Sequence, residues 1–135
     1  MKVVCFVPLR KQSKRVLDKN NQLIGGKSLV SHVTHSVAEC SGIDSFCLYS
    51  SSADYLNDAH HRFQLVIREP HLDRDETLGI DIYKSFARIV PADIYILVHA
   101  TSPFLTSRSL QIGLNSVMND GYDSSFSVSK IQTFA

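Results

Sequence analysis

Val3-Val4-Cys5-Phe6-Val7 is a continuously apolar run near the start of this chain. A run of this length is typical of a strand that is buried on both faces of a parallel sheet. Residues 8–20, which follow it, carry five basic side chains and a single acid. Open α/β sheets bind ligands beyond the carboxyl ends of their strands. The sequence therefore predicts a site for an anionic ligand at residues 8–20.

Working outward, the rest of the chain alternates between helical and strand-like patterns. Apolar residues recur at helical spacing, and short apolar runs lie between them. This alternation predicts an α/β domain with a mostly parallel sheet, covered by helices on both faces. The expected helices are 29–38, 53–60 (a short one), 80–90 and 107–118, and the expected further strands are 46–49, 64–67, 94–98 and 125–129. We expect one domain over residues 1–135, incomplete at its carboxyl end because no helix covers the last strand.

The overall charge excludes some partners. The chain has 14 Lys plus Arg against 13 Asp plus Glu, for a formal net charge of +1. A nucleic-acid or membrane surface would need a broad basic face, so we expect neither partner. No apolar run approaches the roughly 20 residues that span a bilayer. The three cysteines have no CxxC spacing, which is typical of a reducing compartment, so we predict a cytoplasmic protein.

The basic segment suits a polyphosphate. Arg binds phosphate oxygens through a bidentate fork, and Lys binds them as a point charge. Such side chains could hold a triphosphate and stabilise the charge that develops as pyrophosphate leaves. Neither GxxxxGK[ST] nor GxGxxG is present, so side-chain charge replaces a glycine cradle. The alternative is a solvated basic loop with no ligand.

Two other segments are candidates for chemistry. His99, Thr101 and Ser102 follow the expected strand 94–98, where they could contact a ligand, although His99 could equally be a strand-end histidine without one. Residues 73–76 are dense in carboxylates, which could hold magnesium or form a solvated turn. The histidine pairs at 32/35 and 60/61 lack a metal-binding framework and are expected at the surface.

Several motifs occur together in one order. Arg10-x-x-Ser13-Lys14 followed by Lys19-Asn20 resembles the amino-terminal signature of the CMP-sugar synthetases, the acylneuraminate cytidylyltransferases and their relatives that activate nonulosonic acids. Residues 26–29 resemble the GKPL that opens the first helix of that family. Residues 68–75 resemble its RPxEL…D segment, and residues 97–104 resemble its LLQPTSPL.

This resemblance implies a three-layer Rossmann-like nucleotidyltransferase fold and a homodimer. It also implies a reaction in which CMP passes from CTP to a sialic-acid-like 2-keto sugar acid, with Mg²⁺ as cofactor and release of pyrophosphate. Arg10 and Lys14 would then be catalytic. The implied nucleotide contacts are Pro8, Leu9, Arg10, Ser13, Lys14, Lys19, Asn20, Arg68, Thr77 and Gly79. The implied sugar-acid contacts are His99, Thr101 and Ser102.

The sequence also departs from the family pattern. Tyr49-Ser50-Ser51 stands where the family has STD, and His99 stands where it has glutamine. The family's magnesium-binding aspartates lie in a carboxyl-terminal half beyond Ala135, so its metal ligands are not identified here. We therefore expect the amino-terminal portion of such an enzyme. The alternatives are a nucleotidyltransferase for another sugar, such as 3-deoxy-manno-octulosonate, and a truncated nucleotide-binding or dimerisation module without turnover.

Overall fold

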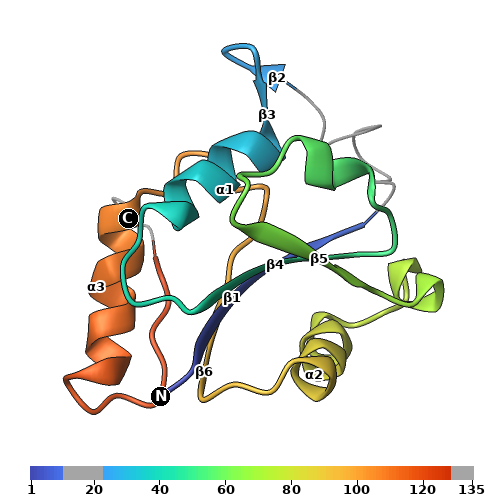
Figure 1. Ribbon diagram of the computed structural model, residues 1–135. Coiled ribbons are helices and arrows are strands. Elements are labelled where there is room, and N and C mark those ends of the chain that lie inside the picture. The colour runs from blue at the N-terminus through green and yellow to red at the C-terminus, as the bar shows by residue number, and fades with distance from the viewer. Residues whose placement is uncertain (11–22, 129–135) are drawn as a thin grey trace, which may run out of the picture.

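The computed structural model describes residues 1–10 and 23–128 of the 135-residue chain. Its centre is a parallel sheet with the strand order β5-β4-β1-β6 (Figure 1). These strands are β1 (Val3–Leu9), β4 (Ser45–Ser50), β5 (Phe63–Ile67) and β6 (Ile94–Leu97). Each pair of neighbours runs parallel, which confirms the predicted sheet.

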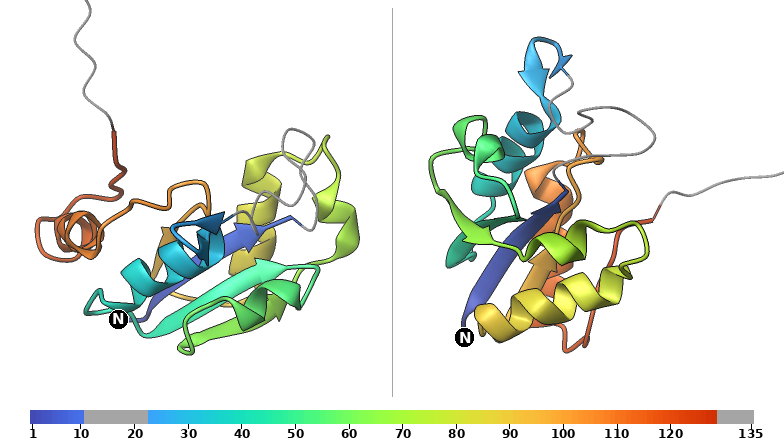
Figure 2. Two further views of the ribbon diagram at one scale, coloured as in Figure 1. Left: turned by 90° about the horizontal axis from the view of Figure 1, so that it is seen from above. Right: turned by 90° about the vertical axis from the view of Figure 1, so that its right-hand side faces the viewer.

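Helices cover both faces of the sheet, which gives the expected three layers. The helices α1 (Leu29–Ala38) and α3 (Ser107–Met118) cover one face, and α2 (Gly79–Ile89) covers the other (Figure 2). Alternate side chains of β1 pack against the helices on opposite faces of the sheet. Cys5 packs in the cluster on the side of α1 and α3, whereas Phe6 stacks on Phe86 of α2 with 4.1 Å between ring centroids. The apolar run is therefore buried on both faces, as predicted.

The connections differ in detail from the sequence expectations. A hairpin of β2 (Leu23–Ile24) and β3 (Lys27–Ser28) turns through two glycines with positive φ, and Ser28 then caps α1. The short helix expected at 53–60 is a single 3-10 turn, η2 (Asp54–Asn57), because the chain turns from there into β5. A second 3-10 turn, η3 (Pro70–Asp73), follows β5.

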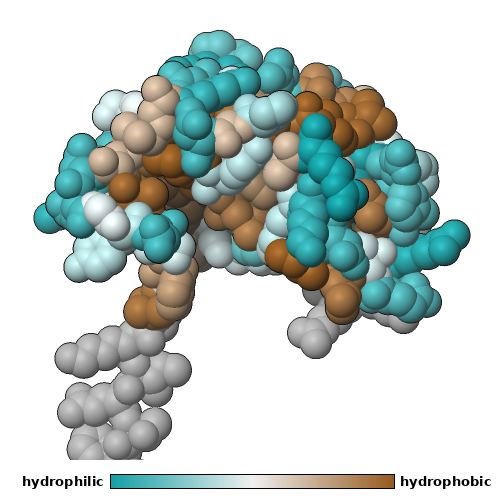
Figure 3. All heavy atoms as spheres, turned by 90° about the horizontal axis from the view of Figure 1, so that it is seen from below, coloured by the Kyte–Doolittle hydropathy of each residue, from teal (hydrophilic) through white to brown (hydrophobic). Residues whose placement is uncertain are grey.

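The prediction of a strand at 125–129 is wrong for its described part, since residues 124–128 form no ladder. A groove of about 670 Å³ lies between β6, α3 and residues 123–127. Ser125 lies against Gly113 of α3, whereas Phe126 and Val128 are 83% and 78% exposed. Residues 124–128 are all exposed, and the segment lies against the helix and pairs with no strand among the described residues. Apolar side chains gather around a hollow on the underside of the molecule (Figure 3).

Candidate functional site

The candidate site begins where three neighbouring strands end. Leu9 pairs with Ser50 of β4, and Ser50 pairs with Ile67 of β5. Each of these residues is the last of its strand, so Arg10, Ser51 and Arg68 follow at one edge of the sheet. Parallel strands thereby bring together polar residues that are far apart in the sequence, as predicted for a strand-end site.

Arg10 is held from two sides. Its guanidinium Nη1 donates a 2.8 Å hydrogen bond to Oδ1 of Asp75, and its backbone carbonyl accepts a 2.7 Å hydrogen bond from the Tyr55 hydroxyl. The Arg10 side chain is 33% exposed and that of Asp75 is 44% exposed. Arg10 is therefore oriented by protein contacts, and its side chain is partly exposed.

Arg68 occupies a different environment. Its side chain is 1% exposed, and its Nε and Nη2 lie 3.0 Å and 2.5 Å from Oδ1 of Asp73. Nη2 also donates a 3.0 Å hydrogen bond to the carbonyl oxygen of Leu9. The structure thus places the Arg68 guanidinium against the end of β1, where its partners are protein groups. Its direct contact with a nucleotide stays a prediction.

Asp73 joins this arrangement to β4. Its second carboxylate oxygen accepts a short hydrogen bond from the hydroxyl of Ser51, the residue at the position where the resembled family has an acid. A carboxylate therefore does reach this position, although η3 supplies it. Sequence reasoning missed this role, and the pairing of Asp75 with Arg10, because residues 73–76 showed a density of charge but not its partners.

The other predicted nucleotide contacts that the structure describes lie near the end of β1 and around the start of α2. Pro8 is half-buried near the end of β1, and the Leu9 side chain belongs to the core. Thr77 donates a 3.4 Å hydrogen bond from its hydroxyl to the carbonyl of His71, and Gly79 begins α2. The Arg10–Asp75 ion pair brings this segment to the end of β1. Ser13, Lys14, Lys19 and Asn20 lie outside the described residues.

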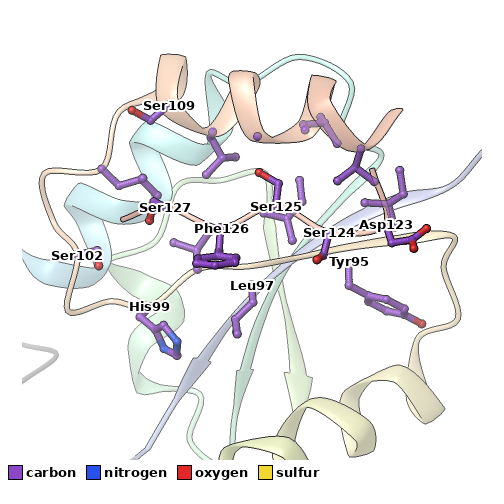
Figure 4. Close-up of a pocket in the computed structure, with 18 of the residues that line it drawn as sticks. Tyr95, Leu97, His99, Ser102, Ser109, Asp123, Ser124, Ser125, Phe126 and Ser127 are labelled. Carbon is purple, nitrogen blue, oxygen red and sulfur yellow. The ribbon is translucent and has the colours of Figure 1, made fainter. Parts of the chain in front are cut away.

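The predicted sugar-acid contacts follow the end of β6. His99, Thr101 and Ser102 are exposed and follow β6, where the backbone N–H of Ser102 donates a 3.1 Å hydrogen bond to the His99 carbonyl. His99 and Ser102 line the groove beside β6 (Figure 4), whereas Arg10 and Arg68 are not among its lining residues. These residues therefore follow the end of β6, the strand that pairs with β1 on the side opposite to β4.

The described part of the arrangement offers no metal centre of its own. Within residues 1–10 and 23–128, no group of three His, Cys, Asp or Glu side chains is placed to hold a metal ion. The carboxylates of residues 73–76 that were candidates for magnesium include Asp73 and Asp75, which pair with arginines instead. These residues therefore do not fit a magnesium site.

Three histidine rings cluster on the α1 side of the sheet. The His60 ring lies 5.0 Å from that of His35 and 4.2 Å from that of His61, centroid to centroid. Desolvation lowers the pKa of His60, and the neighbouring His61, His35 and Arg62 lower it further.

The helices of the described chain are too short or too polar to cross a membrane.

Comparison with known proteins gives a family match over nearly the whole chain. A family profile described as cytidylyltransferase matches residues 4–134. The N-acylneuraminate cytidylyltransferase of Streptococcus agalactiae serotype III is 24% identical over an alignment of 136 positions, which covers 98% of this chain and 33% of that protein. The enzyme of the same name from Oncorhynchus mykiss is 27% identical over 128 residues, which cover 93% of this chain and 30% of the relative.

Solved structures show the same fold. The structure of CMP:2-keto-3-deoxy-manno-octonic acid synthetase complexed with CTP matches with a TM-score of 0.77 and 21% identity, covering 90% of this chain and 49% of that one. A cytidylyltransferase from Leptospira borgpetersenii serovar Hardjo-bovis matches with a TM-score of 0.67 and 14% identity, covering 90% and 51%. The chain thus spans about a third of the curated relatives and about half of these solved chains.

Proposed function

The chain belongs to the cytidylyltransferase family, and from this premise we propose that it transfers CMP from CTP to a sialic-acid-like 2-keto sugar acid and releases pyrophosphate. The observation that carries the proposal is the placement of Arg10. This arginine leaves the end of a central strand, is partly exposed, and is oriented by contacts on its side chain and on its backbone. A guanidinium in this position suits a triphosphate, since it donates paired hydrogen bonds to phosphate oxygens.

In the proposed reaction, the anomeric hydroxyl oxygen of the sugar acid attacks the α-phosphorus of CTP in line with the leaving group. A new phosphorus–oxygen bond forms, the bond between the α-phosphorus and the bridging oxygen to the β-phosphate breaks, and the hydroxyl proton passes to solvent. Arg10, together with Lys14 of the basic segment, neutralises the charge that grows on the departing pyrophosphate. His99, Thr101 and Ser102 contact the sugar acid.

Magnesium and a homodimer belong to the proposal through the family resemblance. Mg²⁺ would neutralise negative charge on the phosphates when bound. Because the described residues do not fit a magnesium site, no step is assigned to the ion here. The nucleotide contacts proposed for Thr77 and Gly79 are supported by the Arg10–Asp75 ion pair, which brings their segment to the end of β1. Arg68 is 1% exposed and bonds to Asp73 and to the Leu9 carbonyl, so its proposed role is to support that strand end.

Two alternatives have their own support. The fold match to a CMP:2-keto-3-deoxy-manno-octonic acid synthetase makes 3-deoxy-manno-octulosonate a second candidate for the acceptor. A nucleotide-binding or dimerisation module without turnover is favoured by the lack of a three-ligand metal cluster among residues 1–10 and 23–128. Pyrophosphate release with CTP and either sugar acid distinguishes these alternatives, and competition by UTP and GTP tests the base.

The direct test of the proposal is calorimetry with CTP on the wild-type chain and on Arg10→Ala and Lys14→Ala. Loss of a charge-assisted hydrogen bond of about 1.5–3 kcal/mol weakens binding by roughly tenfold or more. Arg108→Ala is the matched control, because Arg108 is an exposed arginine in the first turn of α3. Wild-type protein that binds no nucleotide, or variants that bind as tightly as wild type, would overturn the proposal.

A further inference from the structure

The two backbone carbonyls that leave the end of β1 both accept hydrogen bonds from side chains. The register between β1 and β4 ends at Leu9 and Ser50, so these carbonyls lie at the end of the ladder. The Leu9 carbonyl accepts a 3.0 Å hydrogen bond from Arg68, and the Arg10 carbonyl accepts a 2.7 Å hydrogen bond from the Tyr55 hydroxyl. The donors come from different parts of the chain, since Tyr55 lies in η2 and Arg68 follows β5.

These two hydrogen bonds act on the peptide planes that flank the Cα atom of Arg10. A residue has only two soft backbone dihedrals, and each of them rotates one of these planes. Holding both planes therefore sets φ and ψ of Arg10 and with them the direction of its Cα–Cβ bond. The side chain leaves the sheet in one direction, in which its guanidinium reaches Asp75.

Both donors are themselves held in place. Tyr55 is 3% exposed and packs in the core cluster on the α1 side of the sheet. Arg68 is 1% exposed and is fixed by Asp73, which in turn accepts a hydrogen bond from Ser51. A buried donor with its own partners loses little further rotamer freedom when it orients another group. The supports of Arg10 are therefore built into the core.

We infer that Tyr55 is a positioning residue for Arg10, with Arg68 as its counterpart on the other peptide plane, and that the two act through Arg10 without touching the ligand. The inference rests on the proposed role of Arg10 as a triphosphate ligand, and it adds residues to which the sequence motifs assigned no such task. Tyr55 and Arg68 pre-orient a cationic side chain for an anionic ligand.

Tyr55→Phe tests the inference, because it removes the hydroxyl and keeps the buried ring. The full chain is titrated with CTP and, separately, with inorganic tripolyphosphate, which carries the phosphates without the base. We expect Tyr55→Phe to weaken both by about 2- to 10-fold, the range that one hydrogen bond supports. Tyr49→Phe is the matched control, since Tyr49 is 1% exposed and loses a 2.7 Å hydrogen bond to Ser85 on the α2 side. It should bind both anions as wild type does.

A double-mutant cycle with Arg10→Ala separates positioning from a general structural effect. If Tyr55 acts through Arg10, then Tyr55→Phe causes no further loss of tripolyphosphate affinity when Arg10 is already alanine. An equal loss in both backgrounds, or no loss in the wild-type background, would overturn the inference. Should Tyr55→Phe fail to fold, Arg68→Lys replaces it in the same cycle, because an ammonium lacks the fork that spans Asp73 and the Leu9 carbonyl.

The two ligands distinguish failure of this inference from failure of the proposed function. Wild-type protein that binds tripolyphosphate but not CTP contradicts the cytidylyltransferase proposal and leaves the cycle able to support the inference. Wild-type protein that binds CTP with no effect of Tyr55→Phe contradicts the inference alone. Wild-type protein that binds neither anion overturns both.

Discussion

The carboxylate of Asp75 accepts a 2.8 Å hydrogen bond from the guanidinium of Arg10, although 65 positions separate the two residues. The pair joins the segment before α2 to the end of β1. It also means that the arginine proposed to bind the triphosphate already has an anionic partner. A phosphate that binds Arg10 must share the guanidinium with this carboxylate or displace it.

We predict that Asp75→Asn tightens the binding of CTP by about 2- to 5-fold, since an exposed ion pair contributes up to about 1 kcal/mol. The substitution keeps the shape of the side chain and removes a negative charge next to the proposed phosphate site. Calorimetry at low salt measures the change, and Asp120→Asn, an exposed acid after α3, is the control. Weaker binding by Asp75→Asn would contradict this prediction and would mean that the orienting effect of the carboxylate on Arg10 outweighs its competition with phosphate.

The Asp73 carboxylate lies between Ser51 and Arg68. We therefore predict that an aspartate at position 51 can replace the one at position 73 as the partner of Arg68. Asp73→Ser leaves a buried guanidinium without its ion-pair partner and should lower the free energy of unfolding by about 3 kcal/mol. The double variant Ser51→Asp/Asp73→Ser should recover much of that loss, because it returns a carboxylate from the neighbouring strand end.

Urea unfolding measures the free energy of unfolding of the single variant and of the double variant. The control is Ser51→Asn/Asp73→Ser, which has nearly the same shape as the rescue variant but no charge. If it restored stability as well as the aspartate does, the ion pair with Arg68 would not be the cause.

The histidine cluster predicts a loss of stability in acid. The pKa of His60 in the folded chain lies below its ordinary value of about 6.5, so the unfolded chain takes up the proton first as the pH falls. The stability that neutral His60 contributes to the folded chain is fully present above pH 6.5. It is lost as the pH falls from there through the pKa of His60 in the folded chain. The difference between the thermal midpoints at pH 7 and pH 5 should be smaller in His60→Asn than in wild type. Equal acid losses in the two proteins would contradict this account.

The three cysteines should be inert in the folded chain. Burial raises the pKa of the Cys5, Cys40 and Cys47 thiols, and all three side chains are at most 4% exposed. Because the thiolate is the reactive form, a disulfide reagent such as DTNB at pH 8 should label none of them quickly and all three in urea. One fast-reacting thiol per folded chain would be inconsistent with the described core.

The sequence predicted the parallel sheet well because its strands are short apolar runs between helical patterns. Buried central strands such as 3–7 and 46–49 leave this signal whatever their neighbours are. The segment 125–129 instead alternates serine with apolar residues, a second pattern that is typical of strands, yet its described part forms no strand. Alternation reports which side chains can share a face, but a ladder also needs a partner edge within hydrogen-bonding distance.

The site was predicted only in outline. The basic segment and the polar residues after β6 were visible as charge and as breaks in the pattern. The contacts that orient Arg10 were not, because Tyr55, Arg68 and Asp75 lie 45 or more positions away from it and only the fold brings them near. Long-range pairing of this kind leaves no periodic signal in a sequence.

The hydrogen bond between Arg68 and the Leu9 carbonyl spans 59 positions, which has a consequence for folding. Contacts of high sequence separation form late, because the loop between their ends must close first. We therefore expect the end of β1 to acquire its support only after β4 and β5 have joined the sheet. Ligand affinity therefore reports completed assembly of this half of the sheet, and a chain trapped before β5 docks should have its first strand but not its anion site.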